Sequence, residues 1–188
     1  MKKFYFIVLS LYLLTAIPAW ACTVTAVGKD ASTDGSVLVS HSDDGLNDPR
    51  LIYVPAMNHK PGALRPVFYS HYALDFKHQW GANETRRIVT SHRGPGYKTT
   101  DAPKSIPLGY IPQVRHTYAY FDANYGIINE HQLSIGECTD KAKVHPEPEA
   151  GKRIFYSAEL SRVVLERCKT AREAIELMGE LIMKYGYY

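Results

Sequence analysis

The first 22 residues constrain this chain more than any other part of it. Two lysines at positions 2 and 3 precede an apolar run over residues 4–17, and the triplet Ala19-Trp20-Ala21 follows. A basic start, an apolar stretch and an A-x-A motif are typical of a secretory leader that signal peptidase removes. The apolar run is shorter than the roughly 20 residues that span a bilayer. We therefore expect residues 1–21 to be a signal peptide, and a secreted or periplasmic protein with no stable membrane insertion after cleavage.

Cleavage after Ala21 would leave residues 22–188, which is the length of about one domain and enough for a hydrophobic core. Loss of the two leader lysines lowers the formal net charge from +3 to +1. The remaining basic residues are scattered, and no nucleic-acid motif or polybasic patch is present in the sequence. We expect no nucleic-acid partner, whereas small neutral or zwitterionic substrates stay open. The sequence leaves the oligomeric state open as well, a homo-oligomer included.

Three cysteines in an exported chain are an odd number, which indicates a reactive thiol or an intermolecular bridge. Cys22 directly follows the predicted cleavage site and is the one that stands out. Cys138 and Cys168 could pair with each other or stay as thiols. Cys168 falls on the apolar stripe of a predicted helix, where unpaired cysteine is usually buried.

The mature N-terminus is predicted to form a β-hairpin. Residues 23–27 and 36–40 are β-prone, and glycines and aspartates lie between them. With the loop centred after Ala31, Cys22 would face His41 across the hairpin, and Asp44 would lie just past the end of the second strand.

The rest of the chain predicts strands followed by helices. Residues 45–115 show no helical period and only weak strand candidates, so we expect long ordered loops that shape a substrate cleft. Residues 116–121 and 133–137 are predicted to be a strand pair. Apolar spacing predicts two amphipathic helices, over 160–168 and 174–182, and Thr170 with Glu173 forms a capping box before the second. This order indicates an α+β fold with helices layered on antiparallel sheet.

A cysteine at a processed N-terminus carries its own base. An α-amine titrates near about 7.7 to 8.0, so it can accept the thiol proton directly or through water. Such a site also needs a carboxylate near the amine and a donor for the oxyanion. Asp44 and Asn129 are the candidates, although an Asp after a strand and an Asn in a turn more often serve the backbone.

Two motifs carry a family resemblance. The segment CTVTAVGKDASTDGSVLVSHSDDG, from Cys22, resembles the opening of the dipeptidase family of N-terminal-nucleophile (Ntn) cysteine hydrolases, which includes the secernins. The segment YGIINEHQLSIGECT, from Tyr125, resembles that family's internal strand–turn–strand signature, and PQVRHTYAYF and the two helical segments also fit.

The resemblance implies a four-layer αββα sandwich and hydrolysis of peptide bonds in short peptides, without a cofactor or metal. It assigns Cys22 as the nucleophile, Asp44 as the partner of its α-amine and Asn129 as a contributor to the oxyanion hole. His41 stands where many relatives have an arginine, so it would add a second pH dependence if it keeps that role. Family members extend well past residue 188, so we expect residues 22–188 to be the N-terminal part of a single Ntn domain, which as a fragment could be inactive.

Three alternatives remain. The related choloylglycine hydrolases and penicillin V acylases cleave other amides, and the protein could belong with them. A bacterial lipoprotein would carry its lipid on Cys22, although Trp20 fits a lipobox poorly. A metal could bind near His41, Asp43 and Asp44, but the sequence has no HExxH motif or paired-cysteine spacing.

Overall fold

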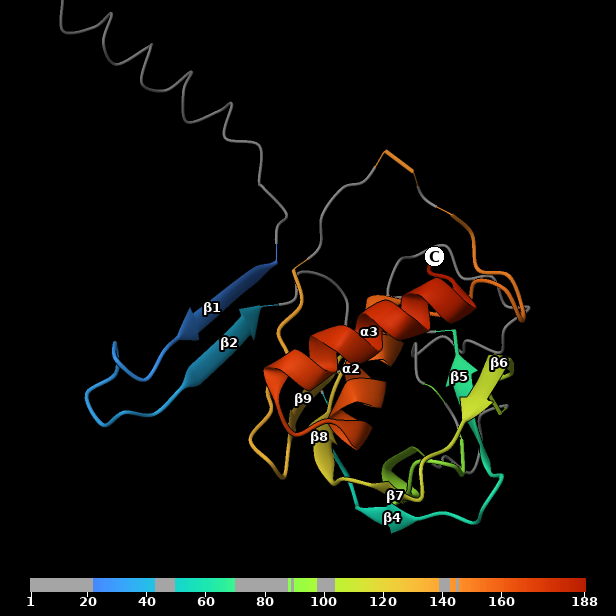
Figure 1. Cartoon of the computed structure of the whole chain (residues 1–188), viewed down its shortest axis with the longest axis horizontal. Coiled ribbons are helices and arrows are strands. Elements are labelled where there is room, and N and C mark those ends of the chain that lie inside the picture. The colour runs from blue at the N-terminus through green and yellow to red at the C-terminus, as the bar shows by residue number, and fades with distance from the viewer. Residues whose placement is uncertain are drawn as a thin grey trace, which may run out of the picture.

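The computed structural model describes residues 22–42, 50–69, 88, 90–97, 104–138, 143–144 and 146–188 (Figure 1). The predicted leader and Asp44 lie outside these residues. The strands are β1 (Thr23–Val27), β2 (Leu38–Ser42), β3 (Ile52–Val54), β4 (Met57–Asn58), β5 (Leu64–Phe68), β6 (Pro107–Pro112), β7 (His116–Thr117), β8 (Tyr120–Asp122) and β9 (Gly126–Asn129). The other elements are a short 3-10 turn, η2 (Pro95–Tyr97), and the helices α2 (Ser157–Arg167) and α3 (Ala171–Tyr185).

Every strand pair among the described residues is antiparallel. The strands form a three-stranded sheet in the order β3-β8-β9 and the two-stranded pairs β1-β2, β4-β7 and β5-β6. Helix α2 packs against β7, β8 and β9, and α3 packs against α2, while the β1-β2 hairpin projects to one side (Figure 1). The fold is therefore α+β, as predicted. The finer four-layer αββα arrangement stays a prediction.

The segment between residues 45 and 115 is not the run of loops that we expected. It contains β3, β4, β5, η2 and β6. Each strand pairs with a partner far away in the sequence, as in the pairs Ile52↔Asp122 and Leu64↔Pro112. Such pairs have no tight turn between them to signal a hairpin, and the prolines at both ends of β6 and inside β5 argue against strands when the sequence is read alone.

The predicted strand pair over 116–121 and 133–137 is also wrong in its boundaries. The first strand is split into β7 and β8, and the partner of β8 is β9, directly after the turn. Residues 133–137 form only an isolated bridge, between Ser134 and Ile128. A tight turn at Gln132, which has a positive φ of 63° and donates its N–H to the Asn129 carbonyl, brings this segment back beside β9.

The N-terminal hairpin forms, but its register differs by two residues from the prediction. His41 lies opposite Val24, and Ser42 lies opposite Thr23. The reason is a longer loop, in which residues 36 and 37 stay outside the strand and the Ser36 N–H donates to Asp34 Oδ1 at 3.0 Å. Because side chains alternate with a period of two, the shift leaves His41 on the predicted face of the hairpin.

Both predicted helices are present. The Thr170 hydroxyl accepts the Glu173 N–H at 3.3 Å, and the Glu173 carboxylate accepts the Thr170 N–H at 3.1 Å, which confirms the capping box of α3. Helix α3 is amphipathic, with Ala174 and Leu181 buried, but α2 is buried from Ala158 to Glu166 and has no solvent face. In the described part of the chain, no helix has the length and apolar character that crossing a membrane requires.

A buried ionic cluster fixes α2 in place. The Glu159 side chain is fully buried and accepts hydrogen bonds from Arg93 at 2.6 Å and from Arg65 and Arg162 at 3.1 Å each. Burial alone raises the pKa of Glu159, but the three arginines together lower it well below its usual value. Arg65 comes from β5 and Arg93 from the segment before η2. One carboxylate therefore joins α2 to two distant parts of the chain.

The same cluster reaches the β8-β9 turn through Arg162. Its Nε donates to the Asp122 carboxylate at 2.8 and 3.0 Å, and its NH2 donates to the carbonyls of Ala123 and Asn124 at 3.1 and 2.7 Å. Asp122 is fully buried, and this burial raises its pKa more than Arg162 lowers it. Arg162 thus holds the conformation of the turn against α2.

We predict that Glu159→Gln destabilises the protein by about 3–5 kcal/mol, because loss of the carboxylate charge removes the acidic partner of the buried Arg93 and one of the two acidic partners of Arg65 and of Arg162. Denaturant unfolding followed by circular dichroism measures this change. The matched control is Glu176→Gln on the exposed face of α3, where we expect less than about 0.5 kcal/mol. A Glu159→Gln variant as stable as the wild type would show that the cluster does not hold the fold.

We also predict that Gly126→Ala destabilises the protein by about 1–3 kcal/mol through overpacking. A Cβ at this position would lie 2.6 Å from Leu165 Cδ1 and 3.3 Å from the Arg162 backbone nitrogen, at the contact between β9 and α2. Gly28→Ala is the control, because a Cβ there meets no atom within 4 Å. Thermal unfolding of both variants compares them, and equal melting temperatures would contradict the close approach.

Candidate active site

One end of the β1-β2 hairpin contacts the rest of the protein, through Cys22, Val24 and His41. Val24 and His41 are cross-strand partners, and Cys22 lies two residues before Val24, so the three side chains share one face of the hairpin. Figure 1 shows that the end of the hairpin that carries Cys22 is the one that meets the rest of the protein. Cys22 is 7% exposed, although most of the strand that follows it is exposed.

The segment after β9 supports Cys22. The Cys138 thiol donates a hydrogen bond to the Cys22 carbonyl oxygen, with a distance of 3.0 Å between sulfur and oxygen. Gly136, two residues earlier, lies so close to β1 that a Cβ there would be 2.8 Å from Val24 Cγ1. The absence of a side chain at Gly136 therefore allows the segment to run directly beside β1.

His41 contacts the turn that Arg162 holds. Its ring lies edge-on to the Tyr125 ring, with 5.6 Å between the centroids, and Tyr125 is buried. Within the described residues, the His41 Nε2 atom is buried and has no hydrogen-bond partner. The structure thus places His41 on the same hairpin face as Cys22, on the neighbouring strand. Its Nε2 atom remains available for a hydrogen bond.

Asn129 has a well-defined structural position at the end of β9. Its Nδ2 donates to the carbonyls of Leu165 and Cys168 at 2.9 and 2.8 Å, and its Oδ1 accepts the N–H groups of His131 and Leu133 at 3.0 and 3.1 Å. The amide therefore joins the C-terminal end of α2 to the turn after β9. A role as oxyanion donor stays a prediction, and it requires one of these donors to leave its present carbonyl.

Asp44 is not among the described residues, so its predicted contact with the α-amine stays a prediction. The nearest described neighbour in the sequence is Ser42. Its Oγ accepts the backbone N–H of Thr23 at 3.0 Å, which brings the end of β2 beside the residue that follows Cys22.

The three cysteines differ in environment, and no disulfide joins them. The Cys138–Cys168 bridge that the sequence left open is not formed. Cys168 is 4% exposed, and burial raises its thiol pKa to about 11, so at neutral pH it is protonated and a poor nucleophile. Cys138 is exposed.

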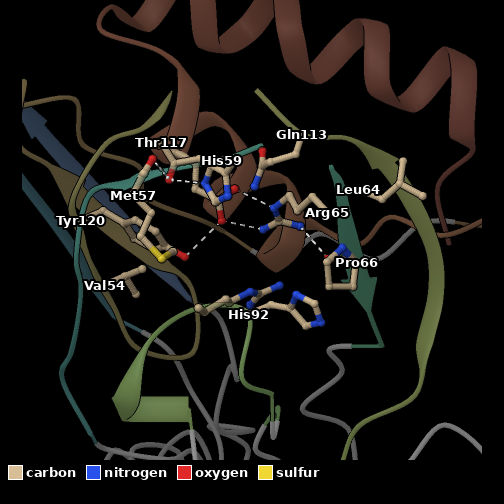
Figure 2. Close-up of a pocket in the computed structure, with 12 residues that line it drawn as sticks. Val54, Met57, His59, Leu64, Arg65, Pro66, His92, Gln113, Thr117 and Tyr120 are labelled. Atoms are coloured by element: carbon tan, nitrogen blue, oxygen red, sulfur yellow. Dashed lines mark hydrogen bonds and ion pairs between the residues drawn. The ribbon is translucent and has the colours of Figure 1, made fainter. Parts of the chain in front are cut away.

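A small cavity lies beside the ionic cluster (Figure 2). Its volume is about 50 Å³, and its lining includes His59, Arg65 and His92. The His59 Nε2 is 3.0 Å from the Thr117 hydroxyl, and burial lowers the His59 pKa. A water molecule needs about 10–15 Å³, so this cavity can hold a few waters but not a dipeptide.

Across the described ranges, no three His, Cys, Asp or Glu side chains gather in a way that could hold a metal ion. Instead, the Cys22 thiol is buried directly before the start of β1, and the His41 imidazole lies on the same face of the hairpin. Sequence reasoning missed Tyr125, Gly136 and Cys138 as neighbours of this site. The motif over residues 125–139 contains all three, but only the packing of that segment on β1 shows their role.

Comparison with known proteins gives a consistent result. The model of the peptidase family C69 matches residues 21–188. The chain is 23% identical over 176 residues to a probable dipeptidase of Latilactobacillus sakei, and 26% identical over 187 residues to a dipeptidase of Bifidobacterium longum. These alignments cover 88% and 89% of the chain but 30% of each relative.

No solved structure matches the chain significantly. The family model, however, covers all of residues 22–188, including both motifs and the two helices. The chain belongs to peptidase family C69.

Proposed function

We propose that this protein is a secreted or periplasmic cysteine hydrolase that cleaves the peptide bond of dipeptides, with Cys22 as its N-terminal nucleophile. The observation that carries the proposal is the position of Cys22. Cys22 directly follows an A-x-A cleavage motif, and it is buried at the end of the hairpin that contacts the rest of the protein. The names of the two dipeptidase relatives support the substrate class, although the chain spans only 30% of their length.

The proposed reaction has two steps. The Cys22 thiol passes its proton to its own α-amine, and the sulfur attacks the substrate carbonyl carbon. The carbon–nitrogen bond then breaks, and the leaving amine takes the proton, so that the first amino acid stays on the sulfur as a thioester. Water attacks the thioester, releases the acid and restores the thiol. No cofactor takes part in this scheme.

The other predicted residues have supporting roles in the proposal. Asp44 orients the α-amine, and His41 takes the place of the arginine found in many relatives. Asn129 contributes to the oxyanion hole, where one lost donor typically costs about 10²- to 10³-fold in rate. Its four present hydrogen bonds make it a positioning residue for the end of β9 as well.

We predict that the mature protein begins at Cys22 with an unmodified α-amine. Mass spectrometry of the intact protein, expressed with its own leader and recovered from the exported fraction, measures this directly. A diacylglyceryl or acyl mass on Cys22 would support the lipoprotein alternative, because an acylated amine cannot act as the base. A start at any other residue would remove the proposed nucleophile–base pair.

We predict that Cys22→Ala lowers kcat/KM on dipeptides by about 10⁴-fold or more, because the covalent step is lost. Cys22→Ser should keep only a small residual activity, since a hydroxyl gives up its proton less readily than a thiol. The control is Cys168→Ala, which removes a buried thiol that lies away from Cys22 and should leave kcat/KM close to the wild-type value.

The substrate panel decides between two branches of amide hydrolysis. Dipeptides are compared with penicillin V and with an N-acylated amino acid, using the complete protein. Hydrolysis of only the acylated substrates would assign the protein to the acylase type. Full activity of Cys22→Ala on every substrate would exclude the mechanism.

A further inference from the structure

Two thiol-bearing residues meet at the candidate active site. The Cys138 sulfur is 3.0 Å from the carbonyl oxygen of Cys22, although the two residues are 116 positions apart in the sequence. The proposed reaction makes no use of Cys138. Its side chain is exposed, whereas Cys22 is buried, so the pair joins an accessible thiol to a sheltered one.

Two contacts fit an antiparallel approach of the segments that carry the two cysteines. Gly136 lies against Val24, and Cys138, two residues later, lies against Cys22, two residues earlier. In an antiparallel strand pair, directly opposite residues have Cβ atoms about 4.5–5.5 Å apart, and the contacts of Gly136 and Cys138 point to a similar approach here. Disulfides join residues whose Cα atoms are about 4.4–6.8 Å apart and whose Cβ atoms are about 3.5–4.5 Å apart. Rotation of the two side chains and a small approach of the two segments would therefore be enough to form a disulfide between Cys22 and Cys138.

We propose that Cys22 and Cys138 form a modification site, a reversible disulfide that blocks the nucleophile until a reductant opens it. The bond itself follows from the packing of residues 136–138 on β1. Its effect on activity rests on the proposed function of Cys22.

The bond forms by two thiol–disulfide exchanges with a small disulfide oxidant, such as oxidised glutathione. The exposed Cys138 thiolate attacks one sulfur of the oxidant and releases the first small thiol. The Cys22 thiolate then attacks the Cys138 sulfur of this mixed disulfide and releases the second. The two protein thiols lose two protons and two electrons in total, and the oxidant becomes two thiols.

Cys168 does not compete for either partner. It is buried at the end of α2, and its backbone carbonyl accepts a hydrogen bond from Asn129. Because burial keeps this thiol protonated at neutral pH, it is a weak attacking group. The third cysteine therefore serves as an internal reference in the experiment.

The test maps the bond directly. The complete mature protein is treated with diamide, an azo compound that accepts two protons and two electrons from a pair of thiols, and remaining thiols are alkylated before non-reducing peptide mapping. We expect one cross-linked peptide pair that contains Cys22 and Cys138, lighter than the separate peptides by two hydrogen atoms, and alkylation of Cys168 alone. Alkylation of both Cys22 and Cys138, or a bridge to Cys168, would overturn the proposal.

The activity measurement uses matched variants. Wild-type activity should fall in proportion to the cross-linked fraction and return with dithiothreitol, and Cys168→Ala should behave in the same way. Cys138→Ser should keep its activity in diamide, and Cys138→Ala repeats the test if the serine variant folds poorly. Equal diamide sensitivity of wild type and both Cys138 variants would contradict the switch.

The mapping result is independent of the enzyme's reaction. A cross-link in a protein whose Cys22→Ala variant is fully active would sustain the disulfide and refute the proposed function. A protein whose dipeptidase activity depends on Cys22 but which forms no cross-link would support the proposed function and refute the disulfide.

Discussion

The buried carboxylate of Glu159 is the constraint on which the rest of the structure depends. A charge without solvent is tolerated only when opposite charges and hydrogen bonds surround it, and here three arginines supply both. These arginines come from β5, from the segment before η2 and from α2 itself, so the carboxylate is satisfied only when all three parts are assembled. The network thus gives specificity to the packing: another position of α2 would leave several buried charges unpaired.

The candidate site is built outward from that network, one contact at a time. Arg162 fixes the β8-β9 turn, and the Tyr125 ring in this turn supports His41 on the hairpin. Asn129, at the end of β9, joins the return segment to the end of α2, and this segment then carries Cys138 to the Cys22 carbonyl. The hairpin would otherwise be a two-stranded sheet, which is at best marginally stable alone. The core therefore positions the end of the hairpin that carries Cys22. We expect a substitution in the core to change the position of the Cys22 thiol.

The sequence predicted best those features that depend on residues close together in the chain. The capping box at Thr170 and the apolar spacing of the helices act within a few residues, and both appeared as predicted. The hairpin face of Cys22 and His41 was also predictable, although the loop shifted their register. The pairing of β5 with β6 depends on partners far apart in the chain. The burial of α2 could not be predicted either, because the spacing of Glu159, Arg162 and Glu166 usually marks a solvent face. Each of them is nevertheless buried, against partners that include Arg65, Arg93 and Asp122 on other parts of the chain.

The proposed export and the proposed thiol catalysis would impose opposite demands on the same residue. A nucleophilic cysteine must stay reduced, whereas the compartments beyond the cytoplasmic membrane favour disulfides. Burial of Cys22 lowers its exposure to oxidants, but the exposed thiol of Cys138 beside it offers a route around that protection. An adjacent partner also has a benefit, because a sulfur held in a disulfide cannot be oxidised further to the irreversible sulfinic and sulfonic acids. The packing of Gly136 on β1 keeps Cys138 beside Cys22, so one glycine would link the geometry of the hairpin to the redox state of the proposed nucleophile.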